Sequence, residues 1–235
     1  MKLILKELKK NFGSKEVLCG ASFAFESGKI YGLLGRNGAG KTTLFNCINE
    51  DLPVDSGSFE VEENGVCRPV QAEDIGYVLS APVVPEFLTG REFLKFFMDI
   101  NKKKIKEEKT IEEYFEMMSI APEDRDRLIK DYSHGMKNKM QMLVNFIANP
   151  GILLLDEPLT SFDVVVADEM KQLLRSMKEK HIIIFSTHIM ELALDLCDEI
   201  VILNEGILRE MDREDLNNTE FKDKIIAVLR GSENV

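Results

Sequence analysis

The stretch Gly35-Arg36-Asn37-Gly38-Ala39-Gly40-Lys41-Thr42 matches the pattern G-x-x-x-x-G-K-[ST] and decides the fold. The nearly all-apolar residues 30–34 precede it and predict a buried strand, and residues 43–48 predict a helix directly after it. In that setting the glycines let successive backbone N–H groups point at phosphate oxygens, and the helix N-terminus adds positive potential. The alternative is a glycine-rich turn with an incidental lysine, and the strand–loop–helix context argues against it.

The polar groups of residues 35–42, called the phosphate loop below, have expected partners. Lys41 is predicted to reach the β- and γ-phosphate oxygens of a nucleotide, and the Thr42 hydroxyl is predicted to bind Mg²⁺. The remaining predicted phosphate contacts are Gly35, Asn37, Gly38, Ala39, Gly40 and Thr43.

Two adjacent carboxylates end a second apolar segment, residues 152–155 (Ile-Leu-Leu-Leu). Neighbouring side chains at the end of a strand point in different directions. We therefore expect Asp156 to face Mg²⁺ while Glu157 faces the water that attacks the γ-phosphate. The alternative for Glu157 is a surface charge that precedes Pro158.

Apolar patterns elsewhere in the chain predict an α/β protein. Residues 21–26 alternate with a period of two, and residues 59–67 predict a hairpin that turns at Asn64-Gly65. Helical stretches separate three later strand-like runs, as in a parallel sheet with crossover helices. These runs are residues 151–155, 182–186 and 200–203.

Helical spacing dominates from about residue 85 to residue 147 and predicts an inserted helical subdomain. Its apolar stripes are interpreted as core, and the charged residues 101–109 as a solvated helix or loop. The stripes consist of Phe93, Phe96, Phe97, Tyr114, Phe115, Met117 and Met118. We expect a single domain over residues 1–235, with a core at 1–84 and 148–216, the helical subdomain at 85–147 and a short C-terminal helix at 217–230.

Composition limits the classes of function. The net charge of −11 and the pI near 4.9 argue against nucleic acid as a partner, because phosphate neutralisation needs a basic surface. The apolar runs are far shorter than the ~20 residues that span a bilayer, so any membrane role requires a partner. The N-terminus has no signal-peptide pattern, and four scattered cysteines are predicted to be reduced thiols of a cytoplasmic protein. They are Cys19, Cys47, Cys67 and Cys197.

Together these segments resemble the nucleotide-binding domain of ABC transporters, in the family's order and over nearly the whole chain. The resemblance implies a P-loop NTPase (RecA-like) core with an N-terminal antiparallel β-subdomain and an inserted α-helical subdomain. It identifies residues 35–42 as the Walker A motif and residues 152–157 as the Walker B motif, with Glu157 as the catalytic carboxylate. It also implies an ATPase that uses Mg²⁺ and works as a dimer, of identical chains or with a paralogue.

A signature motif of the family also has a counterpart. Tyr132-Ser133-His134-Gly135-Met136, called the signature segment below, stands in the place of L-S-G-G-Q and precedes a predicted helix that Ser133 caps. The resemblance implies that Ser133 and Gly135 contact the γ-phosphate of ATP held by the other subunit. The alternative is an ordinary helix cap with no ligand.

Three further residues match the family by position. His188 matches a switch histidine that contacts the γ-phosphate and acts in catalysis. Asp163, in Thr160-Ser161-Phe162-Asp163, matches a residue of the loop that helps to form the dimer interface. Phe12 resembles the aromatic residue on which adenine stacks, and a core phenylalanine is the alternative.

Ser80 departs from the family pattern. It ends Ile75-Gly76-Tyr77-Val78-Leu79-Ser80, where the family usually has a glutamine that reaches Mg²⁺ and the attacking water and communicates with the membrane subunit. Serine is too short to reach the metal directly. We therefore expect Ser80 to act on the metal through a bridging water.

The expected function is to power a separate membrane-spanning permease from the cytoplasmic face of a membrane. The Tyr-Ser-x-Gly-Met variant and the absence of an extra C-terminal regulatory domain resemble subunits of bacterial exporters. One alternative is a soluble ABC ATPase without a transport role, similar to the iron–sulfur assembly ATPase. Another is a subunit that binds ATP but hydrolyses it poorly, which Ser80 and the altered signature segment would suggest.

Overall fold

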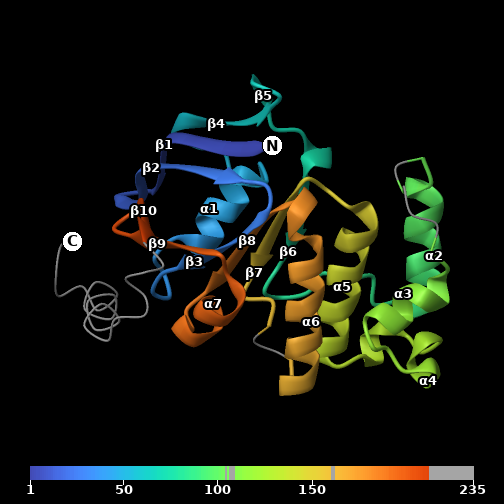
Figure 1. Ribbon diagram of the computed structural model, residues 1–235. Helices are drawn as coiled ribbons and strands as arrows, with labels where there is room; N and C mark the ends of the chain where they lie inside the picture. Colours follow the sequence, from blue (N-terminus) through green and yellow to red (C-terminus); the bar gives the residue numbers. More distant parts are fainter. Residues whose placement is uncertain (104, 106–108, 160–161, 212–235) are drawn as a thin grey trace.

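The computed structural model describes residues 1–103, 105, 109–159 and 162–211. In these residues two β-sheets share one end of the molecule with helix α1, and a group of helices lies to the other side (Figure 1). The expected C-terminal helix at residues 217–230 lies outside the described residues, as does part of the charged stretch at 101–109.

A four-stranded antiparallel sheet forms the N-terminal part, in the order β2-β1-β4-β5. Its strands are β1 (Lys2–Phe12), β2 (Lys15–Glu26), β4 (Ser56–Glu63) and β5 (Val66–Pro69). The predicted hairpin at residues 59–67 is confirmed by the pairing of β4 with β5, and Asn64 takes the positive φ of 53° that such a turn requires. This sheet supplies the N-terminal antiparallel β-subdomain of the expected fold class.

The second sheet has six strands in the order β10-β9-β3-β8-β7-β6. They are β3 (Lys29–Leu34), β6 (Ile75–Val78), β7 (Ile152–Asp156), β8 (Ile182–Thr187), β9 (Glu199–Asn204) and β10 (Ile207–Met211). All neighbouring pairs are parallel except β9 with β10, which confirms the predicted parallel sheet. Because parallel strands end at the same edge, the segments that follow β3, β6, β7 and β8 gather there.

Several of the helices begin at a side-chain cap that the sequence offers. Thr89 and Thr110 each form a capping box with the glutamate three residues later, at the starts of α2 and α3. The helices are α1 (Lys41–Ile48), α2 (Gly90–Asn101), α3 (Ile111–Met117), α4 (Pro122–Arg125), α5 (His134–Ala148), α6 (Val164–Met177) and α7 (Met190–Leu196). Short 3-10 turns occur at Ala72–Asp74, Ile129–Asp131 and Lys178–Lys180.

The six-stranded sheet buries apolar side chains on both of its faces. In β7, Leu154 packs into a cluster with α1 and the small sheet, whereas Leu153 and Leu155 pack into a cluster with α5 and α6. Residues of β8 alternate in the same way between the two clusters. Burial on both faces explains why these strands are continuous apolar runs rather than alternating ones.

The interpretation of the apolar stripes as core is confirmed for most but not all of them. Tyr114, Phe115 and Met118 are buried, and Phe93, Phe97 and Met117 pack partly against the core. Phe96 is 58% exposed, so assigning it to the core was wrong. On α2 it follows Phe93 by three residues, and periodicity alone did not show how wide the buried face of the helix is.

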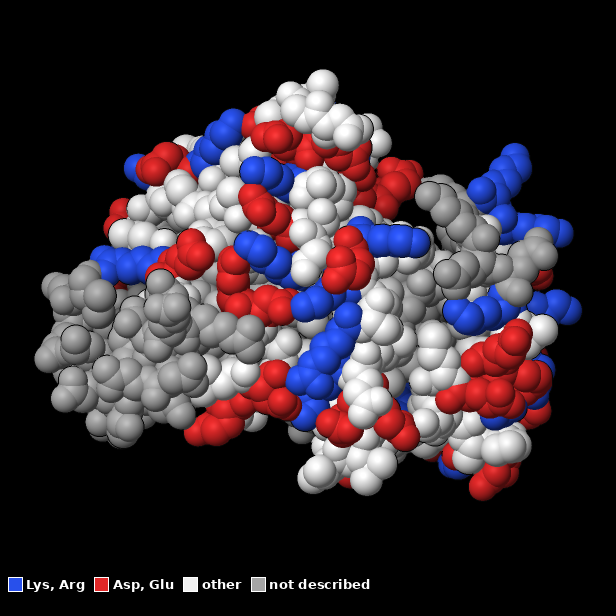
Figure 2. All heavy atoms as spheres, viewed as in Figure 1, with Lys and Arg blue, Asp and Glu red and all other residues white. Residues whose placement is uncertain are grey.

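Acidic and basic side chains are interleaved on the face drawn in Figure 2. Ion pairs between described residues include Lys171 of α6 with Asp195 of α7, and Lys178 with Asp198. Fully exposed ion pairs contribute little to stability, about 0–1 kcal/mol each. These two pairs are partly covered, with side chains 17% and 49% exposed in the first and 28% and 29% in the second. Among the described residues, every helix is too short or too polar to cross a bilayer.

Candidate functional site

A cavity of about 520 Å³ lies at the edge of the six-stranded sheet where β3, β6 and β7 end. Its volume is in the range of sites that take small ligands and cofactors. Ten of the residues that the sequence singles out line this cavity, called the phosphate-loop cavity below. They are Phe12, Asn37, Gly38, Gly40, Lys41, Thr42, Thr43, Ser80, Asp156 and Glu157. Gly35 and Ala39 do not line it, although both lie in the phosphate loop.

The phosphate loop has a backbone that only glycine adopts without strain. Gly38 and Gly40 have φ values of 82° and 105°, and Gly40 is the N-cap of α1. At Gly35 an added Cβ would lie 2.9 Å from the carbonyl oxygen of Leu203, so the neighbouring strand β9 leaves no room for a side chain. Glycine at these three positions therefore fits the shape of the loop.

Lys41 is only 6% exposed and folds back over the loop. Its Nζ donates to the carbonyl oxygen of Gly35 at 2.7 Å and to that of Arg36 at 3.3 Å. Burial lowers the pKa of Lys41, and the negative charges of Glu157 and Asp156 act in the opposite direction. A buried cation held mainly by carbonyl dipoles is well placed to exchange them for phosphate oxygens.

Asp156 joins the end of β7 to the start of α1. The Thr42 Oγ1 donates to Asp156 Oδ2 at 2.7 Å, and the hydroxyl of Ser186 on β8 donates to Asp156 Oδ1. One carboxylate and one hydroxyl fit Mg²⁺, which takes oxygen ligands and usually keeps waters and substrate phosphates. No cluster of three or more His, Cys, Asp or Glu side chains suited to a metal occurs in the described part of the chain, and Mg²⁺ held in this way needs none.

Glu157 has a left-handed backbone, with φ of 49°. This conformation is unfavourable for a side chain other than glycine and is found at functional sites where the surroundings enforce it. Here Ser186 enforces it, because the Glu157 N–H donates to both the carbonyl oxygen and the Oγ of Ser186 at 3.2 Å. His188 follows β8, and its Nδ1 lies 3.0 Å from Glu157 Oε1. The structure thus brings both predicted catalytic residues together, although His188 does not line the cavity itself.

Phe12 is the last residue of β1, lines the cavity and is 48% exposed. A core position, the alternative to the adenine platform, does not agree with this exposure. The Lys10 Nζ lies 5.7 Å from the centre of the Phe12 ring.

Three residues of the site were missed by sequence reasoning. Lys15 and Val17, from the start of β2, line the cavity beside Phe12. Ser186 is fully buried, donates to the Asp156 carboxylate and accepts from the Glu157 N–H. A serine near the end of an apolar strand was the available signal for Ser186, and the short turn after Phe12 was the signal for the other two.

The signature segment lies at the start of α5 and does not line the phosphate-loop cavity of this chain. Ser133 is the N-cap of α5, as predicted, and its Oγ accepts from the Met136 N–H at 3.2 Å. Ser133 and Gly135 are therefore not among the predicted phosphate contacts that line this cavity.

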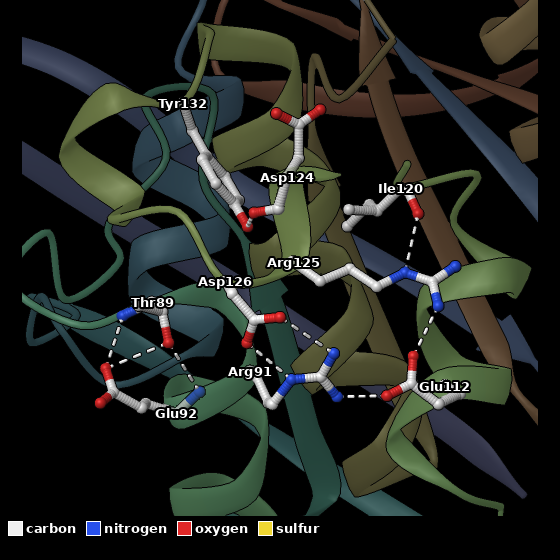
Figure 3. A network of polar contacts seen from close by, with 9 residues as sticks. All are labelled: Thr89, Arg91, Glu92, Glu112, Ile120, Asp124, Arg125, Asp126 and Tyr132. Carbon is white, nitrogen blue, oxygen red and sulfur yellow. Dashed lines mark hydrogen bonds and ion pairs between the residues drawn. The ribbon is translucent and has the colours of Figure 1, made fainter. Parts of the chain in front are cut away.

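Buried and charged groups of α2, α3 and α4 hold the signature segment in place (Figure 3). The Tyr132 hydroxyl donates to the carbonyl oxygen of Asp124 at 2.6 Å, and Tyr132 is 5% exposed. Arg91 pairs with Asp126 and Glu112, and Arg125 also pairs with Glu112. The segment is thus part of the helical side of the molecule.

Asp163 is the N-cap of α6, where its Oδ1 accepts from the N–H groups of Val165 and Val166 at 3.0 Å. Residues 160–161 of the same predicted loop lie outside the described residues. The four cysteines are free thiols, as expected.

Comparison with known proteins agrees with this geometry. The sequence profile of the ABC transporter family matches residues 18–160. The uncharacterised ABC transporter ATP-binding protein YdbJ of Bacillus subtilis (strain 168) is 31% identical over 211 residues, which are 88% of this chain and 68% of that protein.

Two solved structures share the fold. One is described as the ATP binding subunit of an ABC transporter, with a TM-score of 0.80, 22% identity and coverage of 98% of this chain and 100% of that chain. The other is described as a dimeric, post-hydrolysis state of the ATP-binding cassette MJ0796 bound to ADP and Pi. It has a TM-score of 0.74 and 20% identity, and the match covers 90% of this chain and 98% of that chain. The profile match spans more than half of the chain, and with the fold and the phosphate-loop cavity it leads to one conclusion: the chain belongs to the ABC transporter family and is an ATP-binding ABC ATPase subunit.

Proposed function

We propose that two such subunits, identical or paralogous, close around two ATP molecules and hydrolyse them to drive a separate membrane-spanning permease. One observation carries the two-subunit site. The signature segment, the sequence feature expected to contact a γ-phosphate, does not line the cavity that most of the other predicted phosphate contacts of the same chain line. A second subunit must then supply Ser133 and Gly135 to complete each site. The dimeric description of the MJ0796 structure supports this arrangement.

In this proposal one chain holds ATP mainly through its core, residues 1–84 and 148–216. Adenine stacks on the exposed ring of Phe12, and the phosphates lie on the phosphate loop and Thr43. Of these residues Asn37, Gly38, Gly40, Lys41, Thr42 and Thr43 line the cavity, and Gly35 and Ala39 belong to the same loop. Residues 85–147 form the helical subdomain and carry the signature segment toward the partner subunit.

Glu157 orients and polarises the water that attacks the γ-phosphate in line. The nearby Nδ1 of His188 positions the Glu157 carboxylate, which leaves Nε2 of His188 for the γ-phosphate. Thr42 and Asp156 are the residues that would hold Mg²⁺. When bound, the metal neutralises charge that develops on the β- and γ-phosphate oxygens.

The first prediction concerns Glu157→Gln, which keeps the shape of the side chain but removes its charge. We expect this variant to bind Mg-ATP, to hydrolyse it very slowly, and to accumulate as an ATP-dependent dimer that light scattering detects. Glu191→Gln, the same change at an exposed position of α7, is the control and should behave as wild type. A strictly monomeric Glu157→Gln protein with normal turnover would remove both Glu157 and the shared site from the mechanism.

A second prediction tests the adenine platform. Phe12→Ala should weaken ATP binding by about 1–3 kcal/mol, the usual range for loss of one aromatic stacking surface. Phe12→Tyr keeps the ring and should bind ATP nearly as well as wild type. Calorimetric titration measures both, with circular dichroism as the check on folding. Equal affinity in Phe12→Ala, or an unfolded protein, would favour a structural role for the residue.

Ser80 lines the cavity near Asp156 but is short, and we infer that it contacts the metal through one bridging water. The third prediction is that Ser80→Gln tightens the Mg²⁺ dependence of hydrolysis or raises basal turnover, because the longer amide reaches the metal directly. ATPase rate against Mg²⁺ concentration compares the two proteins. Identical curves, with and without the permease, would exclude Ser80 from the metal site. A wild-type chain that binds ATP without hydrolysing it would favour the alternative of an impaired subunit.

Exposed apolar side chains support a protein partner. Val83 and Phe87 follow Ser80 along the chain and are 72% and 79% exposed, and Phe96 and Ile100 of α2 are 58% and 63% exposed. Exposed apolar groups gathered in one part of a chain mark interaction surfaces. We propose that the permease docks here and holds the subunit at the cytoplasmic face of the membrane. The similarity of the signature segment to those of bacterial exporters favours export.

The fourth prediction is that a polytopic membrane protein co-purifies with this chain from native membranes. Phe87→Ser should reduce its recovery, because the substitution removes the exposed ring without touching the cavity. Val66→Ser, at a 68% exposed apolar position on β5, is the matched control and should leave recovery unchanged. Recovery of soluble partners alone would favour a soluble ABC ATPase instead.

A further inference from the structure

The segment that carries Ser80 is held by a side chain from another part of the chain. The amide of Gln141, on α5, donates from Nε2 to the carbonyl oxygen of Leu79 at 2.9 Å. Its Oε1 accepts from the N–H of Val83 at 2.8 Å. Gln141 is 5% exposed, and both hydrogen bonds are partly buried. One amide thus holds the backbone on both sides of Ser80.

The same helix also contacts the segment after Glu157. Asn138 precedes Gln141 by three residues, so both side chains lie on one face of α5. The Asn138 Nδ2 donates to the carbonyl oxygen of Pro158 at 2.8 Å, and Pro158 directly follows Glu157. Two amides of α5 therefore hold the two segments that bring Ser80 and Glu157 to the phosphate-loop cavity.

Further along, the chain after Ser80 is bound to the residues next to the signature segment. The N–H of Ile129 donates to the carbonyl oxygen of Leu88 at 2.8 Å, and the N–H of Lys130 donates to that of Glu86 at 3.1 Å. Lys137, in α5, pairs with the Glu86 carboxylate at 2.5 Å. Residues 79–88 are thus attached at both ends to the helical side that carries Ser133 and Gly135.

We propose that Gln141 is a positioning residue that couples the ATP bound in one chain to the placement of that chain's signature segment. A change at Ser80 when ATP and metal bind moves Leu79 and Val83, and the Gln141 amide passes the movement to α5. Ser133 caps the same helix about 12 Å away, eight residues at 1.5 Å per residue, and moves with it. The proposal rests on the two-subunit site proposed above, because the signature segment contacts only the ATP that the partner subunit holds.

The role requires both ends of the amide. A leucine of similar size fills the same space but offers neither the donor for Leu79 nor the acceptor for Val83. A glutamate keeps the acceptor for the Val83 N–H and loses the donor for the Leu79 carbonyl. The two variants Gln141→Leu and Gln141→Glu therefore separate packing from hydrogen bonding.

The fifth prediction compares ATP binding with hydrolysis in Gln141→Leu. We expect the affinity of the single subunit for ATP, titrated without Mg²⁺, to stay within about twofold of wild type, while kcat falls by at least about fivefold, the lower end of usual coupling between sites. In the Glu157→Gln background, Gln141→Leu should also weaken the ATP-dependent dimer. Gln141→Glu should lie between wild type and Gln141→Leu in both assays.

Amide hydrogen exchange supplies a readout that a loss of stability alone does not produce. In Gln141→Leu, peptides that cover residues 79–83 should exchange faster. Mg-ATP should protect residues 133–137 in wild type and protect them less in the variant, while residues 35–42 stay protected in both. The control is Asn145→Ala, one turn further along α5. The Asn145 amide donates to the Tyr77 carbonyl oxygen at 3.4 Å, and Tyr77 precedes Ser80 in the chain. It should keep the wild-type kcat and the wild-type protection of residues 133–137.

Several outcomes would overturn the proposal. One is a Gln141→Leu protein with wild-type kcat, dimerisation and protection of residues 133–137. Another is an equal loss of ATP affinity and kcat, which would indicate general damage to the site. If Gln141→Leu does not fold, a folded Gln141→Glu protein with wild-type behaviour would also reject the role. A Glu157→Gln protein that never dimerises would instead reject the two-subunit site itself, and with it this coupling.

Discussion

The parallel pairing of β3 with β8 and of β8 with β7 is the constraint on which the site depends. Register places Asp156 opposite Ser186, so the Ser186 hydroxyl reaches both Asp156 and the Glu157 N–H. The same edge carries the phosphate loop after β3, and Thr42 reaches Asp156 across 114 residues of sequence. A shift of one residue in this pairing would turn Asp156 toward the opposite face of the sheet.

Local dipoles rather than net charge suit this acidic chain to a polyanionic ligand. The chain carries a net charge of −11, yet the phosphate loop presents backbone N–H groups, the N-terminus of α1 and one buried lysine. Two carboxylates, Asp156 and Glu157, lie in the same cavity, and their charges oppose the lowering of the Lys41 pKa that burial causes. The charges of such a site are balanced when phosphates and a divalent cation bind together, because the cation compensates the carboxylates and the phosphates compensate the lysine and the cation.

The departures from the family pattern become understandable only in the folded chain. Tyr132 stands where the family has leucine, and its hydroxyl uses the extra length to reach the carbonyl oxygen of Asp124 (Figure 3). Ser80 stands where the family has glutamine, and a glutamine is present beside it after all, on α5 at position 141. The Tyr132 hydrogen bond holds the signature segment to Asp124, and the Gln141 hydrogen bonds hold the segment around Ser80 to α5; all three bonds are partly buried.

The sequence by itself determined the elements and the phosphate-binding chemistry. Strands β3, β7 and β8, the hairpin of β4 and β5, and the Ser133 cap of α5 were all predicted, because periodicity, turn residues and caps act over a few neighbouring residues. The family match at residues 18–160 agrees with the motifs that were read from the same stretch. The roles assigned to individual site residues stay predictions.

The tertiary structure alone decided which residues meet. It placed Ser186 between the Asp156 carboxylate and the Glu157 N–H, exposed Phe12 and Phe96, brought Lys15 and Val17 to the cavity, and joined Gln141 to the segment around Ser80. These contacts join residues far apart in sequence, such as Leu79 with Gln141, and no local pattern encodes them. They depend on strand order and register and on how far each helix face is buried, and the packing of the whole chain sets these properties.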